Sequence, residues 1–233
     1  DATIVKTDFT ACNLINADFS GVTLQDVNLE KAGLSRAIFK GTEFNNVNMV
    51  GADLSLTIFD DVDLSKVRLQ KAQFAQSTVE DMNFNGQDLT EVVFDKGKVA
   101  GSRFEKAKLN GTSFFDTEVS KNFFKNAQML KADFDGAYIF KSIFDNAELT
   151  KANFASANIE SSAFTGAKMT GANFSGAVLK KVDFTNADLT GMKINADTKM
   201  DNVIFDGADL SNAKIEKFTA KRVFYNNQTK FPA

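Results

Sequence analysis

The side chains most often used in catalysis and metal binding are nearly absent from this chain of 233 residues. It contains no histidine and one cysteine, Cys12. Catalysis by a histidine base, a Ser-His-Asp triad, histidine ligation of a metal and a cysteine-rich zinc site are therefore excluded. A single cysteine also allows no internal disulfide.

Carboxylates are the remaining candidates for chemistry. The densest group is Asp60, Asp61 and Asp63, whose oxygens could hold a cation weakly. The simpler interpretation is an acidic, solvated corner. The glycines are spaced in fives, unlike the G-x-G-x-x-G and G-x-x-x-x-G-K loops that bind phosphates. We therefore predict no catalytic residue, no cofactor and no metal site, and we expect that the protein is not an enzyme.

A strict period of five organises the chain. Every fifth residue from Ile4 to Ile194 is large and apolar, and a small residue, most often Ala, lies two positions before it. This period matches neither a helix nor a flat strand, so it predicts a repeat architecture with a narrow, close-packed interior. Twelve of the fourteen glycines follow the large residue by two positions, Gly207 in a shifted register. Because glycine tolerates positive φ, this position predicts a corner in each unit.

A longer period of twenty residues is also present. From Phe74 to Phe184 the large position alternates between Phe and an aliphatic residue, and the aliphatic residues alternate between β-branched and unbranched types. Four corners per coil and identical side chains stacked between coils are predicted. The two expected aromatic stacks are Phe84, Phe104, Phe124, Phe144, Phe164 and Phe184, and Phe74, Phe94, Phe114, Phe134, Phe154 and Phe174.

The repeating unit identifies a family resemblance. Units such as Ala17-Asp18-Phe19-Ser20-Gly21 resemble the pentapeptide-repeat family, whose consensus is A-(D/N)-L-x-x, and the resemblance covers essentially residues 2–215. It implies an all-β fold, a right-handed quadrilateral parallel β-helix with four pentapeptides per coil. At roughly 4.8 Å per layer, about ten to eleven coils would form a rod on the order of 50 Å long.

The pattern predicts one elongated domain, the β-helix of residues 1–215, followed by a C-terminal cap at 216–233. The register moves by one residue within Asn195–Lys199, which we expect to form a local bulge with Met200 buried below it. The cap is expected because the repeat is lost after Ile215 and a solenoid needs its last layer covered. No comparable cap precedes Ile4, so we expect a partner or preceding residues to cover the N-terminal end.

Charge and the first residue bear on partners and location. The net charge is −3, but residues 1–63 carry ten acids and four bases, which gives one acidic end that can steer partners. Lysines elsewhere alternate with acids, so direct nucleic-acid binding is not expected. No apolar run is long enough for membrane insertion. A start at Asp1 suits a soluble protein exported to the periplasm or thylakoid lumen after signal removal, or a trimmed chain.

Large apolar residues at outward positions are candidates for partner binding. Phe123 and Ile143 should stack in one column, with Phe140 around the adjacent corner and stacked lysine pairs beside them (Lys121 and Lys141, Lys131 and Lys151). Either these side chains cover the rod by packing on each other, or they form an interaction site. The full set is Phe115, Phe123, Leu130, Tyr138, Phe140 and Ile143.

Two functions compete at this stage. The family resemblance implies a non-catalytic rod, a protein-interaction or scaffold module with protein partners of unknown identity. The alternative is a DNA-mimicking binder of DNA gyrase, as some relatives of the quinolone-resistance type are. The expected rod dimensions fit this alternative. The modest net charge and the uninterrupted register count against it.

Overall fold

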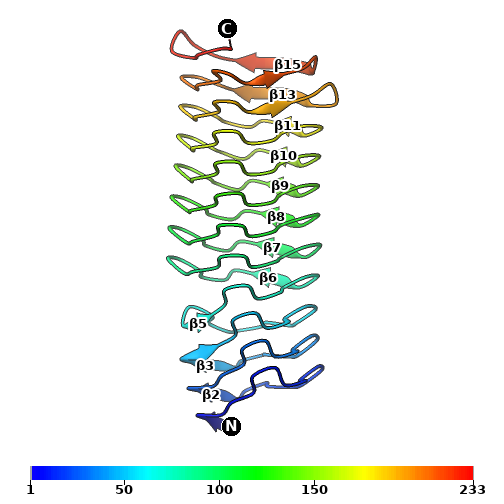
Figure 1. Cartoon of the computed structure of the whole chain (residues 1–233), viewed down its shortest axis with the longest axis vertical. Coiled ribbons are helices and arrows are strands. Elements are labelled where there is room, and N and C mark those ends of the chain that lie inside the picture. The colour runs from blue at the N-terminus through cyan, green and yellow to red at the C-terminus, as the bar shows by residue number, and fades with distance from the viewer. Residues whose placement is uncertain (1, 233) are drawn as a thin grey trace.

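The protein is a rod of stacked coils, with the two chain ends at opposite ends of the rod (Figure 1). The computed structural model describes residues 2–232, and among these there is no helix. Parallel strands in about 11 turns form a β-solenoid, which confirms the predicted fold. Backbone pairs join residues one coil apart in four columns, which begin with Thr3 and Thr23, Asp8 and Asn28, Asn13 and Gly33, and Asp18 and Ile38.

The four columns define four faces of the rod. We name them by the residues they carry in mid-rod: face I (138–140), face II (143–145), face III (148–150) and face IV (153–155). By the period of twenty, each of the remaining residues lies either on one of these faces or at a corner between two of them. Each outward side chain therefore has one neighbour directly below and one directly above.

Strands are short because the chain turns every five residues. One sheet contains β1 (Thr3–Val5), β2 (Thr23–Gln25) and β3 (Glu43–Asn45). Two small sheets pair β4 (Val47–Asn48) with β5 (Val67–Arg68) and β12 (Lys193–Ile194) with β14 (Lys214–Ile215). The largest sheet, of eight strands, contains β6 (Thr78–Glu80), β7 (Lys98–Ala100), β8 (Glu118–Ser120), β9 (Tyr138–Phe140), β10 (Asn158–Glu160), β11 (Val178–Lys180), β13 (Lys199–Ile204) and β15 (Thr219–Phe224).

The predicted corners are confirmed by the backbone. Nearly all corner residues, two positions after the large residue, have φ between 48° and 73°, the left-handed region; Lys66 and Ala196 are exceptions. All twelve glycines of the repeat position belong to this set, and Lys and Asn occupy many of the other corners. Left-handed backbone is favourable for glycine and tolerable for Asn, which explains why these residues recur at the corners.

The interior is filled by the two predicted Phe ladders. Successive rings within each ladder have centroids 4.6 to 5.3 Å apart and are stacked. Rings of the two ladders also meet edge to face, as Phe134 and Phe144 do at 5.8 Å and 85°. The side chain of Phe134 is completely buried.

A polar ladder runs through the corner between faces I and II. At most other corners the small residue donates its N–H to the backbone carbonyl of the large residue three positions earlier, as Ala127 does to Phe124. No such turn bond forms at Asn122, whose N–H instead donates to the Ser142 hydroxyl at 3.2 Å. Ser102 N–H donates to Asn122 Oδ1 at 2.9 Å, and Ser142 N–H to the Ser162 hydroxyl at 3.1 Å. These buried side chains satisfy donors that the corner geometry leaves free.

The one-residue phase shift is absorbed at a corner. Met200 lies in register above Leu179 and is only 4% exposed. Asn195 replaces a backbone acceptor with its side chain, because its Oδ1 accepts the Gly176 N–H at 2.7 Å. The buried Thr198 hydroxyl donates to the Phe174 carbonyl at 3.0 Å. The extra residue therefore leaves the core columns continuous.

The segment expected to be a cap forms another coil within its described residues. β15 pairs in register with β13, and Lys230 pairs with Asp209. A second one-residue insertion precedes Lys230, and Asn226 and Thr229 make the same hydrogen bonds there as Asn195 and Thr198 do below. The segment 216–232 therefore continues the stack as a further layer.

The register is interrupted at one place that the sequence pattern did not reveal. Strands β1 to β3 lie on face II, whereas β6 to β11 lie on face I, where β13 and β15 also begin. Residues 59–66 connect these two arrangements, and no strand or bridge contains them. We call this stretch the junction. Phe59 and Val62 are only partly buried there, in contrast to the large and small residues of most other coils.

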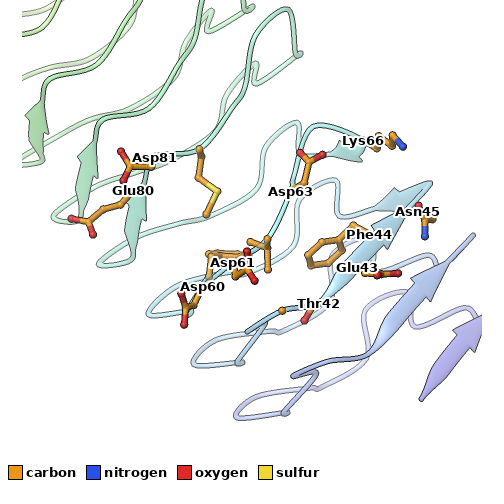
Figure 2. A pocket seen from close by; sticks show the side chains of 14 residues that line it. Thr42, Glu43, Phe44, Asn45, Asp60, Asp61, Asp63, Lys66, Glu80 and Asp81 are labelled. Atoms are coloured by element: carbon orange, nitrogen blue, oxygen red, sulfur yellow. The ribbon is translucent and has the colours of Figure 1, made fainter. Parts of the chain in front are cut away.

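Acidic side chains of successive coils meet around the junction. The period of twenty places Asp60 below Glu80, Asp61 below Asp81 and Asp63 above Glu43. At a layer spacing of about 4.8 Å, each pair of carboxylates repels, and like charges directly opposite destabilise strand pairing. Figure 2 shows these acids around the open space between the coils.

A candidate interaction surface on two faces

The structure places the six predicted binding residues on all four faces. Phe123 and Ile143 are paired on face II, and Tyr138 and Phe140 lie on β9 of face I. These four residues share two neighbouring faces in mid-rod, and we call them the aromatic surface. Leu130 lies on face III and Phe115 on face IV, so neither belongs to it.

Aromatic rings dominate this surface. Tyr138 and Phe140 point outward from the same strand, with their rings 6.2 Å apart and 11° from parallel. Tyr138 is 41% exposed and Phe123 is 39% exposed, while Phe140 and Ile143 are half-buried. A rigid ring pair of this kind can be desolvated when a partner binds, with little loss of side-chain entropy.

Lysines stand at the corner between the two faces. Lys121 and Lys141 occupy that corner in successive coils, with φ of 57° and 50°. The Lys141 ammonium lies 4.9 Å from the centre of the Phe140 ring, a cation–π contact. Lys131 and Lys151 occupy the corner between faces III and IV, away from the aromatic surface.

A hollow lies below the ring pair on face I. Ser120 and Ala100 follow Phe140 down its column, and their small side chains leave a depression of about 430 Å³ that Tyr138 and Phe140 border. Large outward residues do not indicate this floor, because its side chains are small. The column Glu80, Ala100, Ser120, Phe140 could have been found from the period of twenty.

Both signs of charge surround the hollow. Lys98 Nζ lies 2.6 Å from Glu80 Oε1, and this hydrogen bond and the Glu80 charge raise the pKa of Lys98 above its usual value. The Ser120 hydroxyl donates to Glu118 Oε1 at 3.3 Å. The hollow therefore combines one aromatic wall with a mixed polar rim, an arrangement common in protein interfaces.

Residues 2–232 contain no group of three or more acidic or cysteine side chains arranged to hold a metal ion. No such group is formed by Asp60, Asp61 and Asp63, which the sequence offered as candidates for a weak cation site. Over the same residues, no helix has the length and apolar character needed to cross a membrane.

Comparison with family models decides the relationship that the repeat suggested. A model of pentapeptide repeats (8 copies) matches residues 4–41 and 37–74, and a model of a pentapeptide repeat region matches residues 118–194 and 137–223. Together they cover most of the chain. The protein belongs to the pentapeptide-repeat family. No curated protein matches the sequence.

Solved pentapeptide-repeat structures are similar to the chain at low identity. HetL, involved in heterocyst differentiation regulation in the cyanobacterium Nostoc sp. strain PCC 7120, is 16% identical, with 94% of this chain and 87% of HetL covered and a TM-score of 0.36. QnrB1, a plasmid-mediated fluoroquinolone resistance protein, is 16% identical over 97% of this chain and 91% of its own, with a TM-score of 0.42. A pentapeptide-repeat protein from the thylakoid lumen of Arabidopsis thaliana is 22% identical, with 54% of this chain and 63% of that protein covered and a TM-score of 0.18.

Proposed function

We propose that this pentapeptide-repeat protein is a non-catalytic rod that binds a protein partner through the aromatic surface of faces I and II. The observation that carries the proposal is the ring pair of Tyr138 and Phe140 above the hollow floored by Ala100 and Ser120. A partner side chain can enter the hollow and lie against an aromatic wall. Buried aromatic contacts of this kind supply much of the binding energy in protein interfaces.

The backbone of the rod supports the same proposal. β9 lies between β8 and β10, and each of its residues is paired on both sides. The ring pair is therefore held by a continuous sheet, and a partner would meet a preformed surface. Preformed surfaces bind more tightly because little conformational freedom is lost on association.

The proposal is tested with the double change Phe123→Ser and Phe140→Ser. Leu130→Ser, which removes an exposed apolar side chain from face III, is the matched control. Proteins captured from the source cell by the wild-type rod are compared with those captured by each variant. We expect the double change to weaken capture of a specific partner by at least about 2 kcal/mol while the control leaves it unchanged.

Thermal unfolding of the same variants separates binding from simple surface packing. If these side chains only cover the rod, the double change lowers the melting temperature and leaves capture unchanged, and the proposal fails. A gyrase supercoiling assay tests the DNA-mimic alternative. We expect no inhibition and no protection from quinolones, because ion pairs such as Glu148–Lys168 and Glu160–Lys180 place opposite charges in successive coils.

A further inference from the structure

The junction opens a groove in the side of the rod. Its volume is about 820 Å³, and it is bounded by residues 41–45 of the coil below, 59–63 and 66 of the junction, and 80–82 of the coil above. Figure 2 shows Thr42, Glu43, Phe44 and Asn45 on one side of the space, Glu80 and Asp81 on the other, and Asp60 and Asp61 between them. We call this space the junction groove.

An unpaired sheet edge lines the groove. In other coils the N–H of the large residue donates to a carbonyl in the next coil, as Phe104 does to Phe123 and Phe124 does to Ile143. Within the described chain, no such bond extends from Phe44 or Asn46 to the junction above, and β3 has only β2 as a sheet neighbour. β3 therefore presents free backbone donors and acceptors to the groove.

The groove is strongly acidic. Its lining contains six carboxylates and one lysine, Lys66, a net charge of −5. Asp60 and Glu80 form ion pairs with Lys40 and Lys98. The other four carboxylates have no ion-pair partner among residues 2–232; they belong to Glu43, Asp61, Asp63 and Asp81.

Beneath the carboxylates the lining is apolar. Phe44 and Met82 are buried, and Phe59 and Val62 are half-buried. A strand entering the groove would place alternate side chains on opposite sides, because successive residues of a strand point to opposite faces. One set of side chains would contact these apolar residues, and the other set would meet the carboxylates.

We propose that the junction groove binds an extended peptide segment in which basic and small apolar residues alternate. The segment adds to β3 as a further strand and hydrogen-bonds the free edge at Phe44 and Asn46. Its lysines or arginines approach Glu43, Asp61, Asp63 and Asp81. Addition of a strand to an open sheet edge is an established mode of peptide recognition, in which the backbone supplies affinity and side chains supply specificity.

The electrostatics favour this occupant over an acidic or neutral one. Carboxylates of adjacent coils repel one another across the junction, and basic side chains placed between them replace the repulsion with attraction. An acidic peptide would add to the repulsion. The interaction is partly exposed to solvent, so added salt should weaken it.

The test uses a fluorescent peptide, Lys-Val-Lys-Val-Lys-Val-Lys, titrated with the rod of residues 1–233 at low ionic strength and followed by anisotropy. We expect saturable binding that weakens at least tenfold in the variant Asp61→Asn/Asp63→Asn/Asp81→Asn. Asn keeps the shape of each side chain and tolerates the left-handed corners at Asp61 and Asp81. A peptide with Glu in place of Lys should not bind. Failure of the lysine peptide to bind overturns the proposal.

A matched control separates the groove from general acidity. The variant Asp116→Asn/Asp133→Asn/Asp135→Asn removes the same charge from face IV and its adjoining corner. We expect it to bind the peptide within twofold of the wild type. Equal weakening in both triple variants would show that the peptide responds to net charge alone, and the proposal would then be wrong. The Phe123→Ser/Phe140→Ser variant should bind the peptide normally, which keeps this test independent of the aromatic surface.

Backbone pairing is tested separately from charge. Two further peptides carry N-methyl groups on the valines or on the lysines, which removes the donors of one strand edge each. We expect one of them to lose at least tenfold in affinity. Hydrogen exchange at the Phe44 and Asn46 amides should slow on addition of the unmodified peptide. If both methylated peptides bind normally and these amides exchange unchanged, strand addition is refuted.

Discussion

Replacing Phe134 with Ala tests the assignment of the core. Its ring stacks between Phe114 at 4.7 Å and Phe154 at 5.0 Å and meets Phe144 edge to face at 5.8 Å. Phe→Ala changes in cores cost about 3–5 kcal/mol, and each aromatic pair contributes about 0.5–1.5 kcal/mol beyond its buried area.

The position of Phe134 favours the upper part of that range. Its N–H donates to the Asn153 carbonyl at 2.7 Å, and similar ladder bonds fix the coils above and below, so the cavity cannot collapse. We expect a loss of about 4–5 kcal/mol in the free energy of unfolding. Phe19 stacks on one ring, Phe39 at 5.3 Å, and is slightly exposed, so Phe19→Ala should cost about 3 kcal/mol.

Guanidinium unfolding followed by circular dichroism measures these losses, and the exposed change Lys131→Ala serves as the control. We expect the control to cost less than about 0.5 kcal/mol. A repeat protein need not unfold in one step, so the comparison also requires that the denaturant dependence of each variant match that of the wild type. Equal losses for Phe134→Ala and Lys131→Ala would refute the assignment of inward and outward positions.

Two other features give direct predictions. The hydrogen bond and charge of Lys230, with donors from Ser211, lower the pKa of Asp209 from 3.8 to about 2. The stability that this carboxylate contributes is therefore present above pH 3.8 and lost as the pH falls toward about 2. The melting temperature of Asp209→Asn should fall less than that of the wild type in this pH window. Melting temperatures that fall in parallel for the two proteins would contradict the lowered pKa of Asp209. Asn195→Ala removes the nearer of two side-chain acceptors of the half-buried Gly176 N–H, since the Thr198 hydroxyl remains at 3.2 Å, and should cost about 1 kcal/mol in chemical denaturation, against almost nothing for the exposed Asn158→Ala. A cost as small as that of the control would mean that water or backbone replaces the amide oxygen.

Most of the fold could be predicted because each coil repeats the same packing problem. The position of Phe134 follows from two periods, five and twenty, and the burial of Met200 follows from the resumed phase after Asn195. The second insertion at Asn226 was not recognised, because the large apolar residues no longer mark the register there. Its signal is the shared Asn-x-x-Thr spacing of the two insertions.

The junction could not be predicted from the large residues, since Leu64 keeps the period and is buried. The signal lies in the columns, where Phe59 is followed by Val79 and Leu54 by Phe74. Side-chain packing within a whole column decides which face carries the strand, so this face cannot be predicted from any single residue. The stacked acids around Asp61 were visible as a cluster, but their effect depends on the acids one coil away.

The candidate site was predicted in part. The pairing of Phe123 with Ile143 follows from the period of twenty. Phe115 and Leu130 are close to these residues along the chain, but each corner of the solenoid turns the chain to another face. The hollow beside Phe140 depends on small side chains, which carry no signal in a search for apolar residues.

The junction also sets the mechanical character of the rod. In a solenoid each coil is held only by its neighbours, so resistance to bending is a sum of local terms along the axis. At the junction, residues 59–66 belong to no bridge, so ladder pairs are missing on face II and at its corner with face I, whereas pairs such as Ile58–Thr78, Val47–Val67 and Asp53–Gln73 remain. The rod therefore has a compliant point about which the N-terminal coils can tilt. A load applied along the axis would concentrate on the pairs that remain bonded, and the first fracture would begin there.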